Sequence, residues 1–576
     1  MHDPLSVTTR DSTLVELLRS RSQLEPDQLA YKFLVDGETD EIDLSYGELD
    51  QQAREIGAYL QKQVARGDRV LLLSPAGLEF IAAFFGCLYA GVIAVPVYPP
   101  RTDRPLDLIE AIANDADAKI ALTTASLFST IEARLANHSR LKSMHWIATD
   151  NITGVSSESW VQPEIAEDSL AFLQYTSGST STPKGVMVSH RNILYNQRLL
   201  QQVFEHTEQT KIVIWLPLSH DMGLIGNIFQ SMYVGVPCIL MSPLMFVQKP
   251  IRWLDAISRY GATTSGAPNF AYDLCVRKIT SEQRSTLDLS RWRVAFNAAE
   301  PVRAKTIEQF TDVFAPCGFR PQTFLPCYGL AEATLIVSGG KRDAVPIIQS
   351  YQKEALENGF ARAPADGDQV RTLVGCGPVL GDQEMVIVDP ESFTICESNH
   401  VGEIWISGPS VSQGYWNREE LTEKTFNSYL ADTGQGPYLR TGDLGFLVQG
   451  ELFITDRIKD LIIIRGQNYS PIDIELKAEE SHPALRANCG AAFTVNGDNG
   501  EEHLIVVHEI ARDSNSDPEE VKGAIRQSIA EYYGLRVYDI RLLMAGTVPR
   551  TTSGKIQRQV CRVAFLNGTL KCVPMG

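Results

Sequence analysis

The 576-residue chain is 44% hydrophobic and 21% charged, which is typical of a globular protein long enough for several domains. Its formal charge of −18 argues against nucleic acid as a partner held by bulk electrostatic attraction. The ten cysteines are scattered. The sequence contains no C-x-x-C and no H-E-x-x-H pattern, so a zinc site is not expected. We therefore expect buried free thiols, a reducing compartment and a cytoplasmic protein.

One apolar run, Phe80–Val97, reaches the length of a membrane-spanning helix. Within it, Ala90-Gly91 is typical of a helix C-cap, and the following β-branched stretch VIAVPV is typical of a strand. The run therefore predicts a buried helix that ends at Gly91 and then a buried strand. We expect no integral membrane segment and, because the N-terminal stretch lacks an apolar core, no secretory signal.

Strand patterns alternate with helix patterns over much of the chain. Strands are expected at Arg69–Leu73, Val92–Val97, Lys119–Thr123, Lys211–Leu216, Val236–Met241, Ala262–Ser265 and Arg293–Asn297. Helices are expected at Leu44–Gln63, Glu79–Tyr89, Asp107–Asp117 and Pro518–Tyr533. Alternation of this kind predicts an α/β fold with parallel sheets and crossover helices.

The stretch Leu170–Gly185, LAFLQYTSGSTSTPKG, begins as a strand and then becomes a loop of hydroxyls, a glycine and Lys184. Backbone N–H groups, hydroxyls and one ammonium group suit the oxygens of a polyphosphate. A solvated Ser/Thr linker explains the same residues, and the residues alone favour neither interpretation. A Walker A loop is excluded, because both of its required positions around Lys184 fail.

Two further segments follow strands. His220-Asp221, in Trp215–Asn227, stands where α/β folds place ligands, although an isolated pair of this kind is more often a capping pair on a loop. In Phe324–Thr334, FLPCYGLAEAT, Tyr328 could stack on a base and Glu332 could bind Mg²⁺ beside phosphate oxygens. A core tyrosine and a carboxylate at a helix start are the alternatives.

The C-terminal part contributes two candidates. Asp443, in the YLRTGDLG segment that we interpret as a glycine-flanked turn, could accept hydrogen bonds from ribose hydroxyls, although a T-G-D turn alone is only a turn. Lys555, in the loop PRTTSGKIQR, would be solvated surface if it stood alone. Between them, Asp456–Asp460 is a charged break between two strands, a pattern that fits a domain junction.

Taken together, six motifs in order resemble the adenylate-forming superfamily, and YTSGST-x-x-PKGV resembles most the fatty acyl-AMP ligases within it. The resemblance implies a large N-terminal domain, residues 1–458, with two parallel-sheet α/β subdomains and a small β subdomain near Gly402–Asn417. It also implies a small, mobile α+β lid, residues 459–576, with Lys459 at the hinge and Lys555 as the catalytic lysine.

The same resemblance implies a set of site residues. The ATP and AMP site would comprise Thr176, Ser177, Gly178, Ser179, Thr180, Lys184, Asn297, Ala298, Ala299, Glu300, Tyr328, Gly329, Leu330, Asp443, Arg457 and Lys555. The acyl pocket would comprise His220, Met222, Gly223, Asn227, Gly266, Ala267 and Pro268. His220 and Glu332 would act in catalysis beside Lys555, and Glu332 and Thr176 would hold Mg²⁺.

The resemblance finally implies ATP-dependent activation of a fatty acid to an acyl-adenylate, with release of pyrophosphate. Transfer to the phosphopantetheine thiol of an acyl carrier protein, not to CoA, is expected from an insertion at about Val345–Gly367, in which Gln349–Gly359 resembles a polar helix. A plain surface excursion would leave a fatty acyl-CoA synthetase as the alternative. An amino-acid activator is disfavoured because Met222–Asn227 and Gly266–Phe270 contain no carboxylate, and a nucleotide-binding regulatory module would not need Lys555.

Overall fold

The computed structural model describes residues 11–100, 106–176, 183–465, 467–497, 501–512, 514, 516–551 and 554–574. Its first sheet has six strands in the order β6-β5-β3-β4-β7-β8, parallel except for the hairpin of β7 and β8. The strands are β3 (Arg69–Leu72), β4 (Ile93–Pro96), β5 (Ile120–Thr123), β6 (His145–Ala148), β7 (Leu170–Thr176) and β8 (Lys184–Ser189). The helices of this region are α3 (Tyr46–Leu60), α4 (Leu78–Ala90), α5 (Asp107–Asp115), α6 (Ala125–Leu135) and α7 (Ser139–Ser143).

The long apolar run divides as the sequence predicts. Helix α4 ends at Gly91, which takes the left-handed conformation with φ of +73°, and the chain continues into β4. Glycine suits this position because it has no Cβ to strain there. Among the described residues, no helix is both long and apolar enough to cross a bilayer.

The second sheet has eight strands in the order β14-β13-β12-β11-β9-β10-β1-β2, with the central pairs parallel and both edge pairs antiparallel. The strands are β1 (Leu29–Leu34), β2 (Glu41–Ser45), β9 (Ile212–Ile214), β10 (Cys238–Met241), β11 (Thr264–Gly266), β12 (Val294–Asn297), β13 (Phe324–Gly329) and β14 (Ile336–Gly339). Its helices are α2 (Leu14–Leu24), α8 (His190–Phe204), α9 (Asp221–Gly223), a π-helix (Leu224–Phe229), α10 (Gln230–Val234), α11 (Pro243–Gln248), α12 (Ile251–Tyr260), α13 (Asn269–Lys278), α14 (Ser281–Arg284) and α15 (Ala304–Phe314).

A small antiparallel sheet follows, in the order β17-β18-β19-β20. It consists of β17 (Glu384–Val388), β18 (Gly402–Ser407), β19 (Leu439–Val448) and β20 (Glu451–Arg457), with α17 (Glu419–Phe426) beside it. Two expectations are corrected here. Asp443 lies inside β19 and not in a turn, and the chain after Ser407 is a loop that reaches β8, where Met187 N–H donates to the Gly414 carbonyl over 2.9 Å.

The expected insertion, at about Val345–Gly367, falls in a two-stranded unit of β15 (Ile348–Gln352) and β16 (Val370–Val374), with α16 (Lys353–Glu357) between them. The prediction of a helix over Gln349–Gly359 was therefore wrong for its first four residues, which are strand, and for its last two, which follow the helix. The Tyr351 side chain packs against the rings of Phe446 and Phe453, with ring centroids 5.0 and 5.6 Å away. Anchoring of this kind overrides the weak helix propensity of a polar segment.

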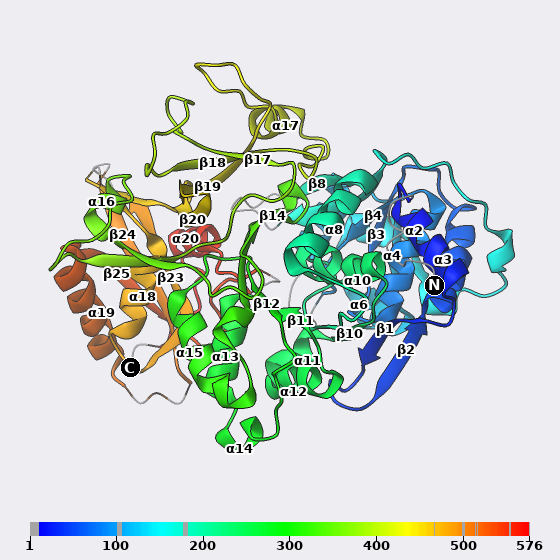
Figure 1. Cartoon of the computed structure of the whole chain (residues 1–576), viewed down its shortest axis with the longest axis horizontal. Coiled ribbons are helices and arrows are strands. Elements are labelled where there is room, and N and C mark those ends of the chain that lie inside the picture. The colour runs from blue at the N-terminus through cyan, green and yellow to red at the C-terminus, as the bar shows by residue number, and fades with distance from the viewer. Residues whose placement is uncertain are drawn as a thin grey trace.

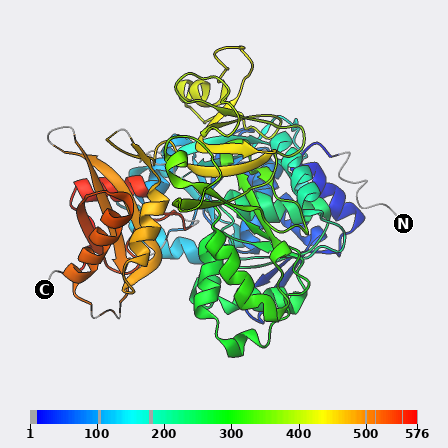
Figure 2. The same cartoon turned by 60° about the vertical axis from the view of Figure 1, so that its left-hand side comes forward.

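The C-terminal domain stands at the left of the molecule in both views (Figures 1 and 2). It contains β21 (Ile462–Ile464), β22 (Gln467–Tyr469), β23 (Leu485–Asn496), β24 (Glu502–Ile510) and β25 (Val537–Leu543). Its helices are α18 (Pro471–Glu480), α19 (Pro518–Tyr533), which has the predicted bounds, and α20 (Arg558–Leu566). The architecture confirms the predicted fold class of two parallel-sheet subdomains, a β subdomain and a small α+β domain.

Candidate active site

A cavity of about 830 Å³ lies where the two large sheets, the β subdomain and the C-terminal domain meet. Its walls come from the carboxyl ends of β7, β12 and β13, from the segment after β9, and from β19, β20 and the Lys555 loop. The predicted site residues that line it are Thr176, Lys184, His220, Met222, Asn227, Ala298, Ala299, Glu300, Tyr328, Gly329, Leu330, Glu332, Asp443, Arg457, Lys459 and Lys555. Ser177, Gly178, Ser179 and Thr180 lie outside the described residues.

Five predicted residues do not line this cavity: Gly223, Gly266, Ala267, Pro268 and Asn297. Gly266 lies behind Phe296, which lines the cavity instead. A Cβ on Gly266 would lie 2.4 Å from the Phe296 ring, so the glycine leaves space for that ring. Asn297 is fully buried and donates from Nδ2 to Oδ1 of Asn269 over 3.1 Å. These residues therefore shape the walls and do not form the cavity surface.

Strands β19 and β20 meet at one end of the cavity, where an aspartate on one strand faces an arginine on the other. The pairing of β19 with β20 puts Asp443 opposite Arg457, and Arg457 Nε donates to Asp443 Oδ1. Tyr328 donates from its hydroxyl to the other oxygen, Oδ2, over 2.8 Å. Each carboxylate oxygen retains a free lone pair for a further donor. Ala299 also lines the cavity, and its φ of +77° is a strained conformation for a residue with a side chain.

Glu332 is held at the other side by the loop that follows β18. Tyr415 donates from its hydroxyl to Glu332 Oε1 over 2.7 Å, and Ser412 N–H donates to the Glu332 carbonyl over 2.9 Å. The Lys184 ammonium lies 5.2 Å from the centre of the Tyr415 ring. Burial, the charge of Lys459 and that of Arg418 lower the pKa of Lys184, and Glu332 opposes this shift. The sequence analysis did not single out Tyr415, because it lies 83 residues from its partner.

His220 and Asp221 cap helix α9 and also line the cavity. His220 Nδ1 and Asp221 Oδ1 are 2.6 Å apart, and Met222 N–H donates to the same Asp221 oxygen over 2.7 Å. Burial alone would raise the pKa of Asp221, but the charges of His220 and Lys555 and the hydrogen bond from Met222 outweigh it and hold this pKa below its usual value. The pair therefore caps a helix and lines the cavity at the same time, so the two interpretations are compatible.

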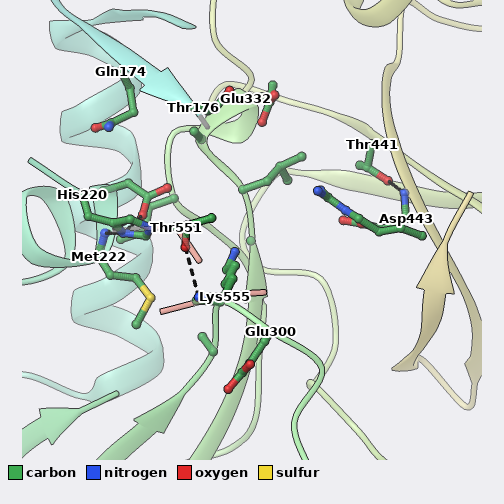
Figure 3. A pocket seen from close by; sticks show the side chains of 18 of the residues that line it. Gln174, Thr176, His220, Met222, Glu300, Glu332, Thr441, Asp443, Thr551 and Lys555 are labelled. Carbon is green, nitrogen blue, oxygen red and sulfur yellow. Dashed lines mark hydrogen bonds and ion pairs between the residues drawn. The ribbon is translucent and has the colours of Figure 1, made fainter. Parts of the chain in front are cut away.

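Lys555 enters the cavity from the C-terminal domain and lies between His220 and Asp443 (Figure 3). Its loop is closed by two hydrogen bonds, from Lys555 N–H to Thr551 Oγ1 over 3.0 Å and from Thr551 N–H to the Lys555 carbonyl over 2.8 Å. Gly554 has a φ of +90° and packs against the Phe270 ring, so this approach requires glycine. Burial and the charge of Arg457 lower the pKa of Lys555, and nearby carboxylates oppose the shift.

The AMP-binding enzyme family matches residues 18–416 of the chain. This chain belongs to the AMP-binding enzymes. It is 50% identical, over 97% of its length and 96% of the relative's, to the medium-chain fatty acid–acyl-carrier-protein ligase JamA of Moorena producens. It is 36% identical, over 96% of its length and 93% of the relative's, to the medium-chain fatty acid–acyl-carrier-protein ligase TtuA of Teredinibacter turnerae. A solved fatty acyl-adenylate ligase from L. pneumophila, in complex with acyl adenylate and pyrophosphate, is 40% identical over 97% of both chains, with a TM-score of 0.77.

These relatives confirm the predicted family, and the AMP-binding enzyme described here is a fatty acyl-AMP ligase. Its described residues contain no cluster of three or more carboxylate, histidine or cysteine side chains that could enclose a metal ion. The carboxylate of Glu332 lines the cavity and lies near Thr176 in Figure 3. Mg²⁺ is usually bound by one or two carboxylates together with substrate phosphates, and this donor set fits that pattern.

The β15–β16 unit, into which the expected insertion falls, contacts the C-terminal domain directly. Lys353, on α16, places its ammonium 3.6 Å from the ring centre of Tyr533 and 4.0 Å from that of Tyr532, both on α19. Arg371, on β16, pairs through Nε with Asp473 Oδ2 over 3.0 Å, and Asp473 lies on α18. The sequence analysis predicted none of these contacts.

Proposed function

We propose that this AMP-binding enzyme activates a medium-chain fatty acid with ATP and then transfers the acyl group to the phosphopantetheine thiol of an acyl carrier protein. In the first step a carboxylate oxygen of the fatty acid forms a bond to the α-phosphorus, and the bond to pyrophosphate breaks. In the second step the thiol sulfur forms a bond to the acyl carbonyl carbon, AMP leaves, and the thiol proton passes to solvent. The position of Lys555 carries this proposal.

Two anions must approach each other in the first step, the fatty-acid carboxylate and the α-phosphate. Lys555 lies between the side of the cavity that holds His220 and the side that holds Asp443. Its ammonium group would hydrogen-bond to both anions and reduce their repulsion, and fixed positioning lowers the entropy cost of the encounter. The cavity position of Lys555 supports this role, because a solvated surface lysine could not bridge two buried ligands.

The nucleotide would occupy the end of the cavity formed by β13, β19 and β20. The Tyr328 ring would lie against the adenine, and the free lone pairs of Asp443 would accept hydrogen bonds from the ribose hydroxyls, with Arg457 fixing the carboxylate. Lys184 and the hydroxyl of Thr176 would contact the β- and γ-phosphates. Ser177, Gly178, Ser179 and Thr180 complete this proposal from the sequence alone.

Glu332 and Thr176 would hold Mg²⁺ together with phosphate oxygens. When bound, the ion would neutralise charge on those oxygens as pyrophosphate leaves. Tyr415 holds the Glu332 side chain in one orientation by its hydrogen bond. The bond uses Oε1, so Oε2 of Glu332 stays available to bind the ion. A pre-oriented carboxylate also loses less entropy when the ion binds.

We propose the domain boundary between residues 458 and 459, with Lys459 as the hinge about which the C-terminal domain turns after adenylation. The insertion would restrain this turn through Lys353 and Arg371, which contact helices of the C-terminal domain. A restrained lid would disfavour free CoA, whereas a carrier protein supplies additional binding energy. The ten cysteines are free thiols, and this supports a reducing compartment such as the cytoplasm.

The test measures ATP–pyrophosphate exchange driven by octanoic acid. Lys555→Ala is expected to abolish exchange and to retain ATP binding. The matched control is Lys571→Ala, an exposed lysine of the same domain, which should exchange like the wild type. Normal exchange in Lys555→Ala would refute the assigned role. Loss of ATP binding in that variant would mean that the lysine serves nucleotide affinity and not the reaction.

A further inference from the structure

Six apolar residues that line the cavity pack together, and we call the part of the cavity beside them the apolar arm. Its side chains belong to a single apolar core cluster that also contains Met222. The residues of this arm are Leu200, Phe204, Phe296, Cys327, Leu335 and Ile336. Leu200 and Phe204 stand one helical turn apart on α8 and therefore face the same side. An arm of this composition suits an unbranched hydrocarbon chain.

Two stacked rings close this arm. The rings of Phe204 and Phe296 are almost parallel, 7° apart with centroids 5.9 Å apart, and the residues are only 4% and 5% exposed. The Phe296 ring already lies against Gly266 of β11, in the space that a Cβ would need. It therefore has no room to move further towards β11. The Phe204 ring in turn contacts the His206 ring, with centroids 5.4 Å apart.

A buried polar layer lies behind Phe204. His206 Nε2 is 3.0 Å from Thr264 Oγ1, and its Nδ1 is 3.1 Å from the Gln230 side chain. All three residues are buried, so an acyl chain that pushed past Phe204 would have to separate hydrogen-bonded groups that have no access to water. The arm therefore has a fixed end and not an adjustable one.

The width of the arm depends on a glycine in the π-helix Leu224–Phe229. A Cβ on Gly226 would come near only one side-chain atom, Leu335 Cδ2 at 3.1 Å, and Gly226 lines the cavity. A larger side chain at this position would consequently extend into the arm. π-Helical turns in α-helices are often found at functional sites, and this one presents its glycine to the cavity.

We propose that Phe204 and Phe296 set the longest acyl chain that the enzyme activates and that Gly226 sets the width of the chain it admits. The inference rests on the proposed function and adds the residues that select among fatty acids. Each methylene that fails to fit an apolar pocket changes kcat/KM by roughly tenfold or more, so a fixed end gives a sharp upper limit.

The experiment measures kcat/KM for pyrophosphate release with hexanoic, octanoic, dodecanoic and hexadecanoic acids. Phe204→Ala should raise the ratio of dodecanoic to octanoic acid by at least roughly tenfold. Gly226→Leu should act in the opposite direction and lose activity on dodecanoic acid first. The matched control is Phe314→Ala, which removes another buried phenylalanine at the end of a helix, α15, that does not line the cavity.

The control should keep the wild-type ratio, whatever stability it loses. If Phe204→Ala does not fold, Phe204→Leu shortens the same side chain with a smaller loss of volume and is measured instead. A wild-type length profile in both the Phe204 variant and Gly226→Leu would overturn the inference while the proposed function stands. Absence of pyrophosphate release from the wild type with every acid would overturn both.

Discussion

Replacing Lys353 by Met tests whether the insertion holds the C-terminal domain. The Lys353 side chain belongs to a residue that is only 7% exposed, and its ammonium lies against the rings of Tyr533 and Tyr532. Burial lowers its pKa, and the neighbouring carboxylates of Glu357 and Asp473 oppose the shift. Methionine keeps a similar length and apolar stem but removes the charge, so the ammonium–aromatic attraction is lost with little change in packing.

A cation–aromatic contact that is shielded from water contributes roughly 2 kcal/mol. If the contact exists only in the lid orientation described here, its loss shifts the equilibrium between lid orientations by roughly 30-fold. Single-turnover transfer from preformed acyl-AMP to CoA should therefore accelerate in Lys353→Met. Lys278→Met, an exposed lysine on α13, is the control and should behave like the wild type.

A double-mutant cycle with Tyr533→Leu separates this contact from a general loosening. The two substitutions remove one shared interaction, so their effects on the transfer rate should fall well short of additive. Full additivity, or a transfer rate to CoA that does not change in either variant, would refute the claim that Lys353 restrains the lid through α19.

Two further predictions concern the site and the fold. Tyr415→Phe removes a hydrogen bond to a charged carboxylate, which is worth about 1.5–3 kcal/mol, and should lower the adenylation rate by roughly tenfold or more. It should also raise the Mg²⁺ concentration needed for half-maximal pyrophosphate release. An unchanged Mg²⁺ dependence would show that Glu332 needs no such support. Burial lowers the pKa of His190 to about 4, whereas its value in the unfolded chain is about 6.5. The unfolded state therefore takes up the proton first as the pH falls from about 6.5 to about 4, and stability decreases over that window by about 2 kcal/mol between pH 7 and pH 5. His190→Asn should reduce the difference in thermal midpoint between these two pH values, and an equal or larger difference would contradict the assignment.

Features that depend on local pattern were predicted closely from the sequence. The bounds of α19 follow from a proline at its first position, a periodic apolar face and a terminal glycine, all of which are adjacent in the chain. The division of Phe80–Val97 into α4 and β4 follows in the same way from Gly91. Short-range steric rules suffice for such elements, because no distant partner decides them.

Features that depend on distant partners could not be predicted from residue chemistry. The segment that becomes β15 resembles a helix, and its pairing with β16 and the packing of Tyr351 on the Phe446 and Phe453 rings make it a strand. The Tyr415–Glu332 hydrogen bond joins residues 83 positions apart, and no spacing rule indicates it. Gly266 was predicted to form the acyl pocket, whereas its lack of a side chain makes room for Phe296, which lines the cavity. The convergence of Lys184 and Lys555 on one cavity was predicted from family resemblance alone.

The most direct test of the account compares two acceptors in parallel reactions. Each contains the enzyme, octanoic acid, ATP and Mg²⁺, and one receives CoA while the other receives a phosphopantetheinylated acyl carrier protein. Mass spectrometry should detect acyl-AMP that persists in the presence of CoA and is consumed with formation of acyl-carrier thioester in the other reaction. Rapid formation of acyl-CoA at a rate equal to carrier loading would contradict the account.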